Sequence, residues 1–419
     1  RPVAALLDTK GPEIRTGVLK DGKKVSLKEG QTFTLTTREI IGDETITHIN
    51  YSGLNEDVAA GNKILIDDGL IELEVEKVEG TEIVCTVING GELGEKKGVN
   101  VPNVKIKLPA LTEKDKEDIR FGIKQGFDFI AASFVRTADC IREIKSMLDS
   151  EGSAIKVIAK IENAEGIDNL DEIIAVADGI MVARGDMGVE IPAQEVPHIQ
   201  KEIIRKCNEA CKTVITATQM LDSMIRNPRP TRAEVTDVAN AVYDGTDAVM
   251  LSGETAQGKY PVEALQMMVH IIENTEKHLD YDVLLEKAQE HRKKGISSAI
   301  GYSSVATAMN LSAKCIITPS VTGATARVVS KFKPKADIIG VTPYEETLRK
   351  MQIYWGVTPV KSIEYNTTED ICNDAIDLVT AKRLVEPGDI VVMTAGIPSP
   401  TIKKSRDGVS NMMRIAVVE

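Results

Sequence analysis

Four short apolar segments of this chain each end in polar residues, and they recur at similar intervals. They are VIAKIEN (157–163), IMVARGDMG (180–188), VITATQ (214–219) and VMLSGET (249–255). Near-continuous apolar runs of this length are typical of parallel strands that are covered on both faces. The polar residues at their carboxyl ends are Lys160, Glu162, Asp186, Thr218, Ser252 and Glu254. The sequence therefore predicts one face at which a cation, carboxylates and hydroxyls meet.

The same alternation extends along the chain in both directions. Residues 3–9 and 128–134 read as further strands, and helices are expected near 137–149, 166–177, 194–211, 231–243 and 261–278. Alternating strands and helices predict an α/β fold of the (β/α)8 TIM barrel type, in which catalytic residues gather at the carboxyl ends of the strands. Six strands of this kind are recognisable and a closed barrel needs eight, so we expect two βα units to precede Arg1.

Residues 14–104 have a different sequence pattern. Polar and apolar residues alternate in TFTLTT (32–37), KILID (63–67), IELEVEKV (71–78) and EIVCTV (82–87), with glycine-containing turns between them. This pattern predicts a small all-β domain inserted into the barrel. Helical periodicity returns after Leu111, where Thr112 and Asp115 have the spacing of a capping box.

The C-terminal part has its own α/β pattern. After a charged stretch at 286–294, strands are expected at CIIT, ADIIGVT and DIVVMTAG. We therefore expect three domains: a barrel at 1–13 and 105–280, an inserted β-barrel domain at 14–104, and a C-terminal α/β domain at 281–419.

Composition excludes several classes of protein. The 419 residues carry a net charge of −12, which disfavours binding to nucleic acid and to anionic membranes. Neither a long apolar run nor a signal-peptide pattern is present, so a cytoplasmic protein without a membrane span is expected. The six cysteines form no C-x-x-C motif and are expected to be reduced. Cys207 and Cys211 share a helix face and are expected in the core.

Lys160 and Glu162 alternate with Ile161, so both side chains can point to the same side of a strand end. A lysine beside a carboxylate suits stabilisation of a phosphoryl group or an enolate, and it would equally suit an ion pair inside a barrel layer. Asp186 adds a second carboxylate from the next strand end. Two carboxylates with open positions between them are suited to Mg²⁺.

The turn at 183–188, Ala-Arg-Gly-Asp-Met-Gly, follows its strand directly. It can open a helical turn whose backbone N–H groups bind a carboxylate or a phosphate. The hydroxyls of Thr216, Thr218 and Ser252, with Glu254, could position or protonate an intermediate, although such hydroxyls often only cap the next helix. The five histidines lie away from these motifs, so acid and base chemistry is expected to proceed without imidazole.

Taken together, several segments resemble the pyruvate kinase family. They are LLDTKGPEIRTG (6–17), KKGVNVP (96–102), ASFVR (132–136), KIEN (160–163), MVARGDMGVEIP (181–192) and the long run from Thr216 to Ala256. The resemblance runs nearly from end to end and is greatest to bacterial forms. It implies transfer of a phosphoryl group from phosphoenolpyruvate to ADP, which gives pyruvate and ATP, with Mg²⁺ or Mn²⁺ and with K⁺.

The resemblance also implies roles for individual residues. Glu162 and Asp186 would hold the divalent ion, Lys160 would stabilise the phosphoryl group, and Thr218 would lie near the enolate carbon, with Ser252 and Glu254 as further catalytic candidates. Substrate contacts would come from Ser133, Ala183, Arg184, Gly185 and Asp186. Asp8 and Thr9 match half of a K⁺ site, and Glu13 matches a carboxylate near it. Arg15 and Lys97 match contacts to the nucleotide phosphates, which makes the inserted domain a lid.

Regulation and assembly follow from the same resemblance. The stretch holding Thr318, Ser320, Thr322, Gly323 and Thr325 would bind a phosphorylated allosteric effector, and the basic residues Lys403, Lys404 and Arg406 could assist. A homotetramer is implied.

The departures from the family pattern concern the first residues and one strand. The family's remaining K⁺ ligands and an arginine that binds the substrate phosphate are expected upstream of Arg1, so these 419 residues alone are expected to be inactive. Thr213 stands where many relatives carry proline.

Two other functions are compatible with parts of the sequence. A metal-dependent enolate aldolase or lyase could use Lys160, Glu162 and Asp186 without a nucleotide, but Arg15 and Lys97 in the inserted domain argue against it. A pseudoenzyme that only binds a phosphorylated effector would not need Lys160, Glu162, Asp186 and Thr218, which are all present at the strand ends.

Overall fold

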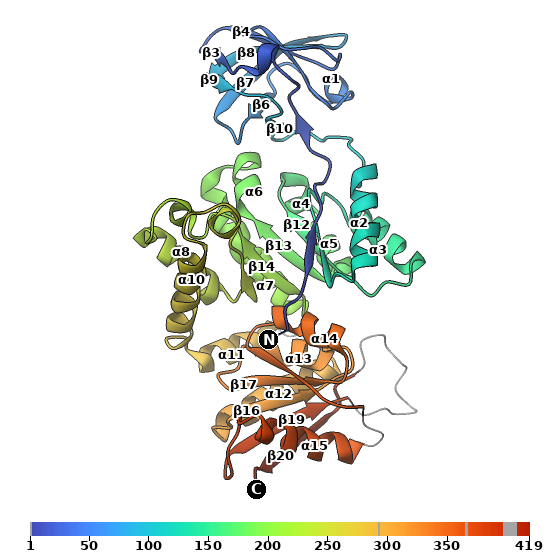
Figure 1. The fold of residues 1–419 in the computed structure, drawn as a ribbon, viewed down its shortest axis with the longest axis vertical. Coiled ribbons are helices and arrows are strands. Elements are labelled where there is room, and N and C mark those ends of the chain that lie inside the picture. Colours follow the sequence, from blue (N-terminus) through green and yellow to red (C-terminus); the bar gives the residue numbers. More distant parts are fainter. Residues whose placement is uncertain (1, 292–293, 365–367, 397–408) are drawn as a thin grey trace.

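The protein is described by a computed structural model that covers residues 2–291, 294–364, 368–396 and 409–419. Three layers are stacked along its long axis (Figure 1): a β-rich layer, a layer with a curled parallel sheet and its helices, and a second α/β layer. The chain starts between the second and third layers, and its first strand runs toward the β-rich layer. The carboxyl ends of the parallel strands therefore face that layer.

The middle layer contains a six-stranded sheet in the order β1-β11-β12-β13-β14-β15, with every neighbouring pair parallel. Its strands are β1 (Leu6–Asp8), β11 (Phe129–Ala132), β12 (Lys156–Ile161), β13 (Gly179–Ala183), β14 (Thr213–Ala217) and β15 (Ala248–Val249). Among the described residues no pairing joins β15 to β1. The predicted barrel-type parallel sheet is confirmed.

Helices follow these strands and cover the sheet. They are α2 (Glu113–Gln125), α3 (Ala138–Ser150), α4 (Ala164–Asp168), α5 (Leu170–Val176), α6 (Arg184–Glu190), α7 (Val196–Glu209), α8 (Arg232–Asp244), α9 (Gly253–Ala256) and α10 (Pro261–Glu276), with 3-10 turns at Ala193–Glu195 and Asp222–Ile225. The predicted capping box is confirmed, because Thr112 Oγ1 accepts from the Asp115 N–H while Asp115 accepts from the Thr112 N–H. The single helix predicted at 166–177 is instead two helices that meet at Asn169.

Aspartates at the amino ends of the strands tie neighbouring strands together. Asp128 accepts from the N–H of Ala5, and Asp247 accepts from the N–H of Val214, at 3.0 and 2.9 Å. Both carboxylates are buried and need a cation, which the third layer supplies: Arg349 donates to Asp128 at 3.0 Å, and Lys331 and Lys333 contact Asp247. The amino face of the sheet is therefore joined to the third layer by buried charge.

The residues from β2 to β10 form the β-rich layer. A seven-stranded sheet has the order β2-β10-β6-β7-β8-β4-β5, and β3 pairs with β9. The bounds are β2 (Ile14–Arg15), β3 (Val25–Leu27), β4 (Thr32–Thr36), β5 (Ile46–His48), α1 (Leu54–Asp57), β6 (Lys63–Ile66), β7 (Ile71–Glu79), β8 (Glu82–Asn89), β9 (Gly91–Leu93) and β10 (Gly98–Asn100), with a 3-10 turn at Lys20–Gly22. Its own apolar core includes Phe33, Leu35 and Ile64.

The third layer is a five-stranded sheet in the order β18-β17-β16-β19-β20, with β20 antiparallel. Its elements are α11 (Tyr281–His291), α12 (Ile296–Asn310), β16 (Cys315–Pro319), α13 (Ala324–Ser330), β17 (Asp337–Thr342), α14 (Glu345–Lys350), β18 (Val357–Lys361), α15 (Thr368–Ala381), β19 (Ile390–Ala395) and β20 (Met412–Val417), with a 3-10 turn at Met351–Ile353. Strands β18 and β20 were not predicted, and no helix bounds had been predicted for this layer. The basic residues Lys403, Lys404 and Arg406 lie outside the described residues.

Two further expectations can be compared with the fold. Cys207 is fully buried in α7, as expected, whereas Cys211 lies beyond the end of that helix with a φ of 54° and is only partly buried. Across the described ranges, none of the helices is both long and apolar enough to cross a membrane.

Candidate active site

Lys160 is the centre of a polar cluster at the carboxyl ends of β1, β11 and β12. Its ammonium donates to Ser133 Oγ at 2.7 Å and lies 3.2 Å from Asp8 Oδ1 and 3.0 Å from Glu162 Oε1. Burial alone would lower the pKa of Lys160, but the charges of Glu162 and Asp8 outweigh burial and raise this pKa. The side chain is therefore a fixed cation at the strand ends.

Glu162 is fully buried beside this cation. Its Oε2 accepts from the backbone N–H of Phe134 at 2.5 Å, whereas Oε1 accepts no hydrogen bond and is only ion-paired to Lys160. Phe134 has a φ of 54°, a left-handed conformation that is strained for a bulky residue. Gly11 allows this turn to pack closely, since a Cβ there would lie 2.9 Å from the Ser133 Cβ.

Two carboxyl groups at this edge have raised pKa values. Burial raises the pKa of Glu162 to about 7, against the opposing effect of Lys160 and with a further contribution from the charge of Asp186. Burial also raises the pKa of Asp186, which begins the first turn of α6, and the negative charges of Asp68 and Glu13 add to this effect. The one nearby ammonium does not neutralise both carboxyl groups, so the pair is short of positive charge.

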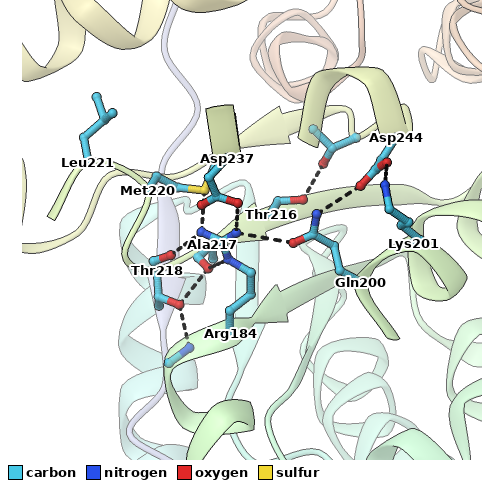
Figure 2. Close-up of polar contacts among 12 residues, drawn as sticks. Arg184, Gln200, Lys201, Thr216, Ala217, Thr218, Met220, Leu221, Asp237 and Asp244 are labelled. Carbon is cyan, nitrogen blue, oxygen red and sulfur yellow. Dashed lines mark hydrogen bonds and ion pairs between the residues drawn. The ribbon is translucent and has the colours of Figure 1, made fainter. Parts of the chain in front are cut away.

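Thr218 follows β14 directly and faces the first turn of α6. Its Oγ1 accepts from the N–H of Gly185 at 2.8 Å and donates to the Ala217 carbonyl at 2.6 Å (Figure 2). Thr218 and Gln219 both adopt left-handed backbone conformations, with φ of 67° and 52°. Two consecutive residues of this kind, one of them β-branched, require strong local support.

Arg184 and Glu254 both form hydrogen bonds with the chain segment that follows β14. The Arg184 guanidinium donates to backbone and side-chain groups behind β14 (Figure 2). Glu254 is 1% exposed and accepts from the N–H groups of Leu221 and Ser252 at 3.0 and 2.7 Å. The Ser252 Oγ is buried without a hydrogen-bond partner, although the residue itself is partly exposed.

A cleft of about 690 Å³ separates the inserted domain from the strand ends. Arg15 and Lys97 line it from the inserted domain, and Asp186 lines it from the barrel. Arg15 is paired with Glu13 at 2.5 Å, and Lys97 with Asp67 at 2.8 Å. Both cations therefore face the cleft while being held by carboxylates of the chain.

The residues of the predicted K⁺ site lie beside the cluster around Lys160. The Asp8 side chain is 57% exposed, whereas Thr9 is buried. Thr9 Oγ1 donates to the Ala131 carbonyl and accepts from the Ser133 N–H, so its hydroxyl is already committed. The Thr9 carbonyl also accepts from Ser133 Oγ, at 2.7 Å, so the exposed Asp8 carboxylate is the oxygen group most open to an ion here.

The predicted effector stretch forms the turn between β16 and α13. Thr318 and Thr325 are buried, with Thr318 donating to the Ile339 carbonyl and Thr325 bonded to Ser410. Ser320 is partly exposed and Thr322 is exposed. Gly323 has a φ of 77°, and a Cβ atom at this position would lie only 2.9 Å from the Met351 side chain. A larger residue would therefore be strained there.

The arrangement defines an α/β barrel enzyme whose strand ends carry an ammonium, two carboxylates and a hydroxyl beneath a β-rich domain. Such a site stabilises transferring or developing negative charge. In the described parts of the chain no group of three or more His, Cys, Asp or Glu side chains is arranged to hold a metal ion. A divalent ion bound by two carboxylates would complete its shell with other oxygen atoms, such as those of substrate or water.

Comparisons with known proteins agree with this class. The family model "Pyruvate kinase, barrel domain" matches residues 1–265, and "Pyruvate kinase, alpha/beta domain" matches residues 298–416. The pyruvate kinase of Clostridium acetobutylicum is 51% identical over 421 residues, covering 100% of this chain and 88% of the relative. That of Geobacillus stearothermophilus is 52% identical, covering 100% and 71%.

A solved structure agrees as well. The crystal structure of a pyruvate kinase from Cryptosporidium parvum has a TM-score of 0.92 and 40% identity, and the match covers 100% of this chain and 84% of the other. The chain belongs to the pyruvate kinase family.

Proposed function

We propose that the full-length protein transfers the phosphoryl group of phosphoenolpyruvate to ADP at the carboxyl ends of β1 and of β11 to β15, giving pyruvate and ATP. The observation that carries the proposal is the Lys160 ammonium, held between Ser133, Asp8 and Glu162 at the carboxyl ends of the strands. A fixed cation of this kind neutralises charge on a phosphoryl group in transfer, where positioning and electrostatics supply most of the catalysis.

A divalent cation fits the pair Glu162 and Asp186. Glu162 Oε1 is buried with only the Lys160 ammonium, at 3.0 Å, as a partner, and burial raises the pKa of both carboxyl groups, so a further cation would stabilise their charged forms. Mg²⁺ or Mn²⁺ bound here would supply that charge and polarise the substrate oxygens. Asp8 and the Thr9 carbonyl would hold K⁺ in the same way.

Residues from several strand ends would bind the substrate and protonate the enolate. Lys160 and Ser133 would contact its phosphate, and the first turn of α6, from Ala183 to Asp186, would offer backbone N–H groups to its carboxylate. After transfer, Thr218 would give its hydroxyl proton to the enolate carbon and recover a proton from solvent. Ser252, whose buried hydroxyl has no partner, lies on the next strand end and would assist this step.

The inserted domain would bind the nucleotide and exclude water. Arg15 and Lys97 line the cleft and would exchange their partners Glu13 and Asp67 for nucleotide phosphates. Closing the cleft would keep water from replacing ADP as the phosphoryl acceptor.

The activity is tested by a coupled assay for pyruvate with the full-length enzyme. We expect pyruvate to form only when ADP, phosphoenolpyruvate, a divalent cation and K⁺ are all present. Pyruvate formation without ADP would instead favour an enolate lyase or aldolase, and binding of phosphorylated ligands without turnover would favour a pseudoenzyme.

Replacing Glu162 by Gln is expected to weaken Mn²⁺ binding strongly. Gln keeps the shape and can still accept from the Phe134 N–H, but it removes one of the two anionic ligands. We expect the dissociation constant for Mn²⁺ to rise at least about tenfold, the scale of altered metal environments, as measured by electron paramagnetic resonance. Glu165→Gln is a matched control in the following helix, and equal Mn²⁺ affinity of the two variants would contradict the assignment.

We also propose that a phosphorylated effector binds at the β16–α13 turn, with Ser320, Thr322 and Gly323 at its exposed part and Thr318 and Thr325 supporting it. The support is the family resemblance of this stretch and the turn geometry. A titration of the full-length enzyme with sugar phosphates and nucleotides should shift the apparent affinity for phosphoenolpyruvate. If none of these compounds shifts that affinity, the proposal is wrong.

Homotetramer formation is likewise proposed from the family and is measured by light scattering.

A further inference from the structure

The guanidinium of Arg184 is directed to the back of β14 and is fully engaged there. Its Nε donates to the Ala217 carbonyl at 3.2 Å, one terminal nitrogen donates to Asp237 at 2.6 Å and to Gln200 at 3.4 Å, and the other donates to the Thr218 carbonyl and Met220 Sδ, both at 2.8 Å (Figure 2). A guanidinium has five N–H groups, and these five contacts account for them.

Arg184 thereby joins four elements around one loop. The residue starts α6, and its partners Gln200 and Asp237 belong to α7 and α8. Its remaining contacts are Ala217, the last residue of β14, and Thr218 and Met220 in the loop that follows. The side chain is 11% exposed, so these charge-assisted bonds are largely shielded from water. They hold the two consecutive left-handed residues, Thr218 and Gln219, which an unsupported loop would not maintain.

The bond to Ala217 has a chemical consequence. The Ala217 carbonyl accepts from both Arg184 Nε and the Thr218 hydroxyl. When the hydroxyl turns its proton toward a ligand, a carbonyl with no other partner would be left buried and unsatisfied, at a cost in free energy. Because Arg184 continues to donate to it, the Thr218 proton can leave without that cost.

We infer that Arg184 is a positioning residue for Thr218: it fixes the left-handed loop and frees the Thr218 hydroxyl proton for the enolate. The inference rests on the proposed role of Thr218 in enolate protonation. In that step the Thr218 O–H bond breaks, a C–H bond forms at the enolate methylene carbon, and Oγ1 regains a proton from solvent. Arg184 itself contacts neither substrate nor the reacting atoms.

The test is Arg184→Met in the full-length enzyme, with two kinetic readouts. The first is kcat and KM for phosphoenolpyruvate, and the second is deuterium incorporation into the methyl group of pyruvate in D₂O with Mg²⁺, K⁺ and ATP, followed by NMR. We expect kcat and exchange each to fall at least about tenfold, within the range that positioned proton transfer contributes, while KM changes less than about threefold. A folded variant with wild-type exchange would overturn the inference.

The same pocket offers a matched control and a rescue. A cavity of about 460 Å³ reaches Arg184 between α7 and α8, and Lys201 lines it as the ion-pair partner of Asp244. Lys201→Met removes a cation from this cavity without touching the β14 loop and should keep wild-type exchange. In Arg184→Ala, added guanidinium should restore part of the exchange rate, whereas a general structural role of Arg184 predicts no response.

Two further variants separate the possible failures. If Arg184→Met does not fold, Asp237→Asn weakens the same tether more gently, and wild-type exchange in that variant would overturn the inference. In Thr218→Ala we expect exchange to be lost. If exchange persists there, the proposed role of Thr218 is wrong and the inference falls with it; if it is lost there but kept in folded Arg184→Met, only the inference fails.

Discussion

Replacing Lys160 by Met is expected to reduce kcat by about 10³-fold or more, the scale on which a single cation stabilises charge in phosphoryl transfer. Met has a similar length and preserves packing, but it removes the ammonium that contacts Ser133, Asp8 and Glu162. Steady-state pyruvate formation by the full-length enzyme measures the loss. Turnover within tenfold of wild type would contradict the role of Lys160.

The Lys160 variant needs a test for its metal site. Lys160 lowers the pKa of Glu162, so its removal raises that pKa further and lets a proton compete with the metal at neutral pH. Mn²⁺ binding should therefore be compared at pH 8.5, where it is expected to persist. Lys156→Met is the matched control, because Lys156 begins the same strand, is partly exposed and pairs with Asp178 at 3.6 Å at the opposite end of the sheet.

The sequence was sufficient to predict the strands of the barrel-type sheet because each is a short apolar run with polar residues at its end. β14, Thr213–Ala217, covers the apolar part of the segment VITATQ (214–219). Prediction was weaker at the edge of the sheet, where β15 is only Ala248–Val249 although the apolar run extends over 248–251. In the third layer β18 and β20 were missed: β18 contains Pro359, and β20 is interrupted by Arg414. Proline and charge are depleted in strands, so pattern alone argues against them.

The sequence also grouped the site residues, but it could not show where each side chain points. Ala183, Arg184, Gly185 and Asp186 were all expected to contact substrate because their stretch resembles the substrate-binding turn of the family. Arg184 and Asp186 are two residues apart on α6, and at 3.6 residues per turn they project to nearly opposite sides. Arg184 therefore reaches behind β14 while Asp186 lines the cleft. Similarly, nothing in the spacing of Glu254 indicates that its carboxylate binds the Leu221 N–H.

Replacing Asp247 by Asn is expected to produce the largest loss of stability. The Asp247 side chain is fully buried and contacts Lys331 and Lys333, whose side chains are 3% and 6% exposed. Removing its charge leaves two buried ammonium groups without their anion, and breaking a buried pair in this way costs about 3–5 kcal/mol. Asn can still accept from the Val214 N–H, so the loss reports the charge. At roughly 2–4 °C per kcal/mol, the thermal midpoint should fall by about 10 °C.

A control for the Asp247 variant exists two βα units earlier in the same sheet. Asp178 accepts from the Val157 N–H in the same manner and pairs with Lys145 and Lys156, but its side chain is 18% exposed. Asp178→Asn is therefore expected to cost only about 1 kcal/mol, as for other solvent-screened pairs. Thermal midpoints that fall equally in the two variants would show that burial of the charge at Asp247 is not what matters.

The pH dependence of the Asp247 variant identifies the cause. Burial lowers the pKa of Lys333 to about 8, with Lys331 adding to this effect and Asp247 opposing it. An unfolded lysine keeps its proton to about pH 10.4, so between these values the unfolded state binds more protons and stability rises with pH. Without Asp247 the pKa of Lys333 falls further, and the loss of unfolding free energy caused by this lysine extends to neutral pH.

Above pH 9 Lys333 of the wild type has already lost its proton, so the substitution deprives only the Lys331 ammonium of its anionic partner. The difference in unfolding free energy between wild type and variant should therefore be larger at pH 7 than at pH 9.5, and an equal difference at both values would contradict this origin.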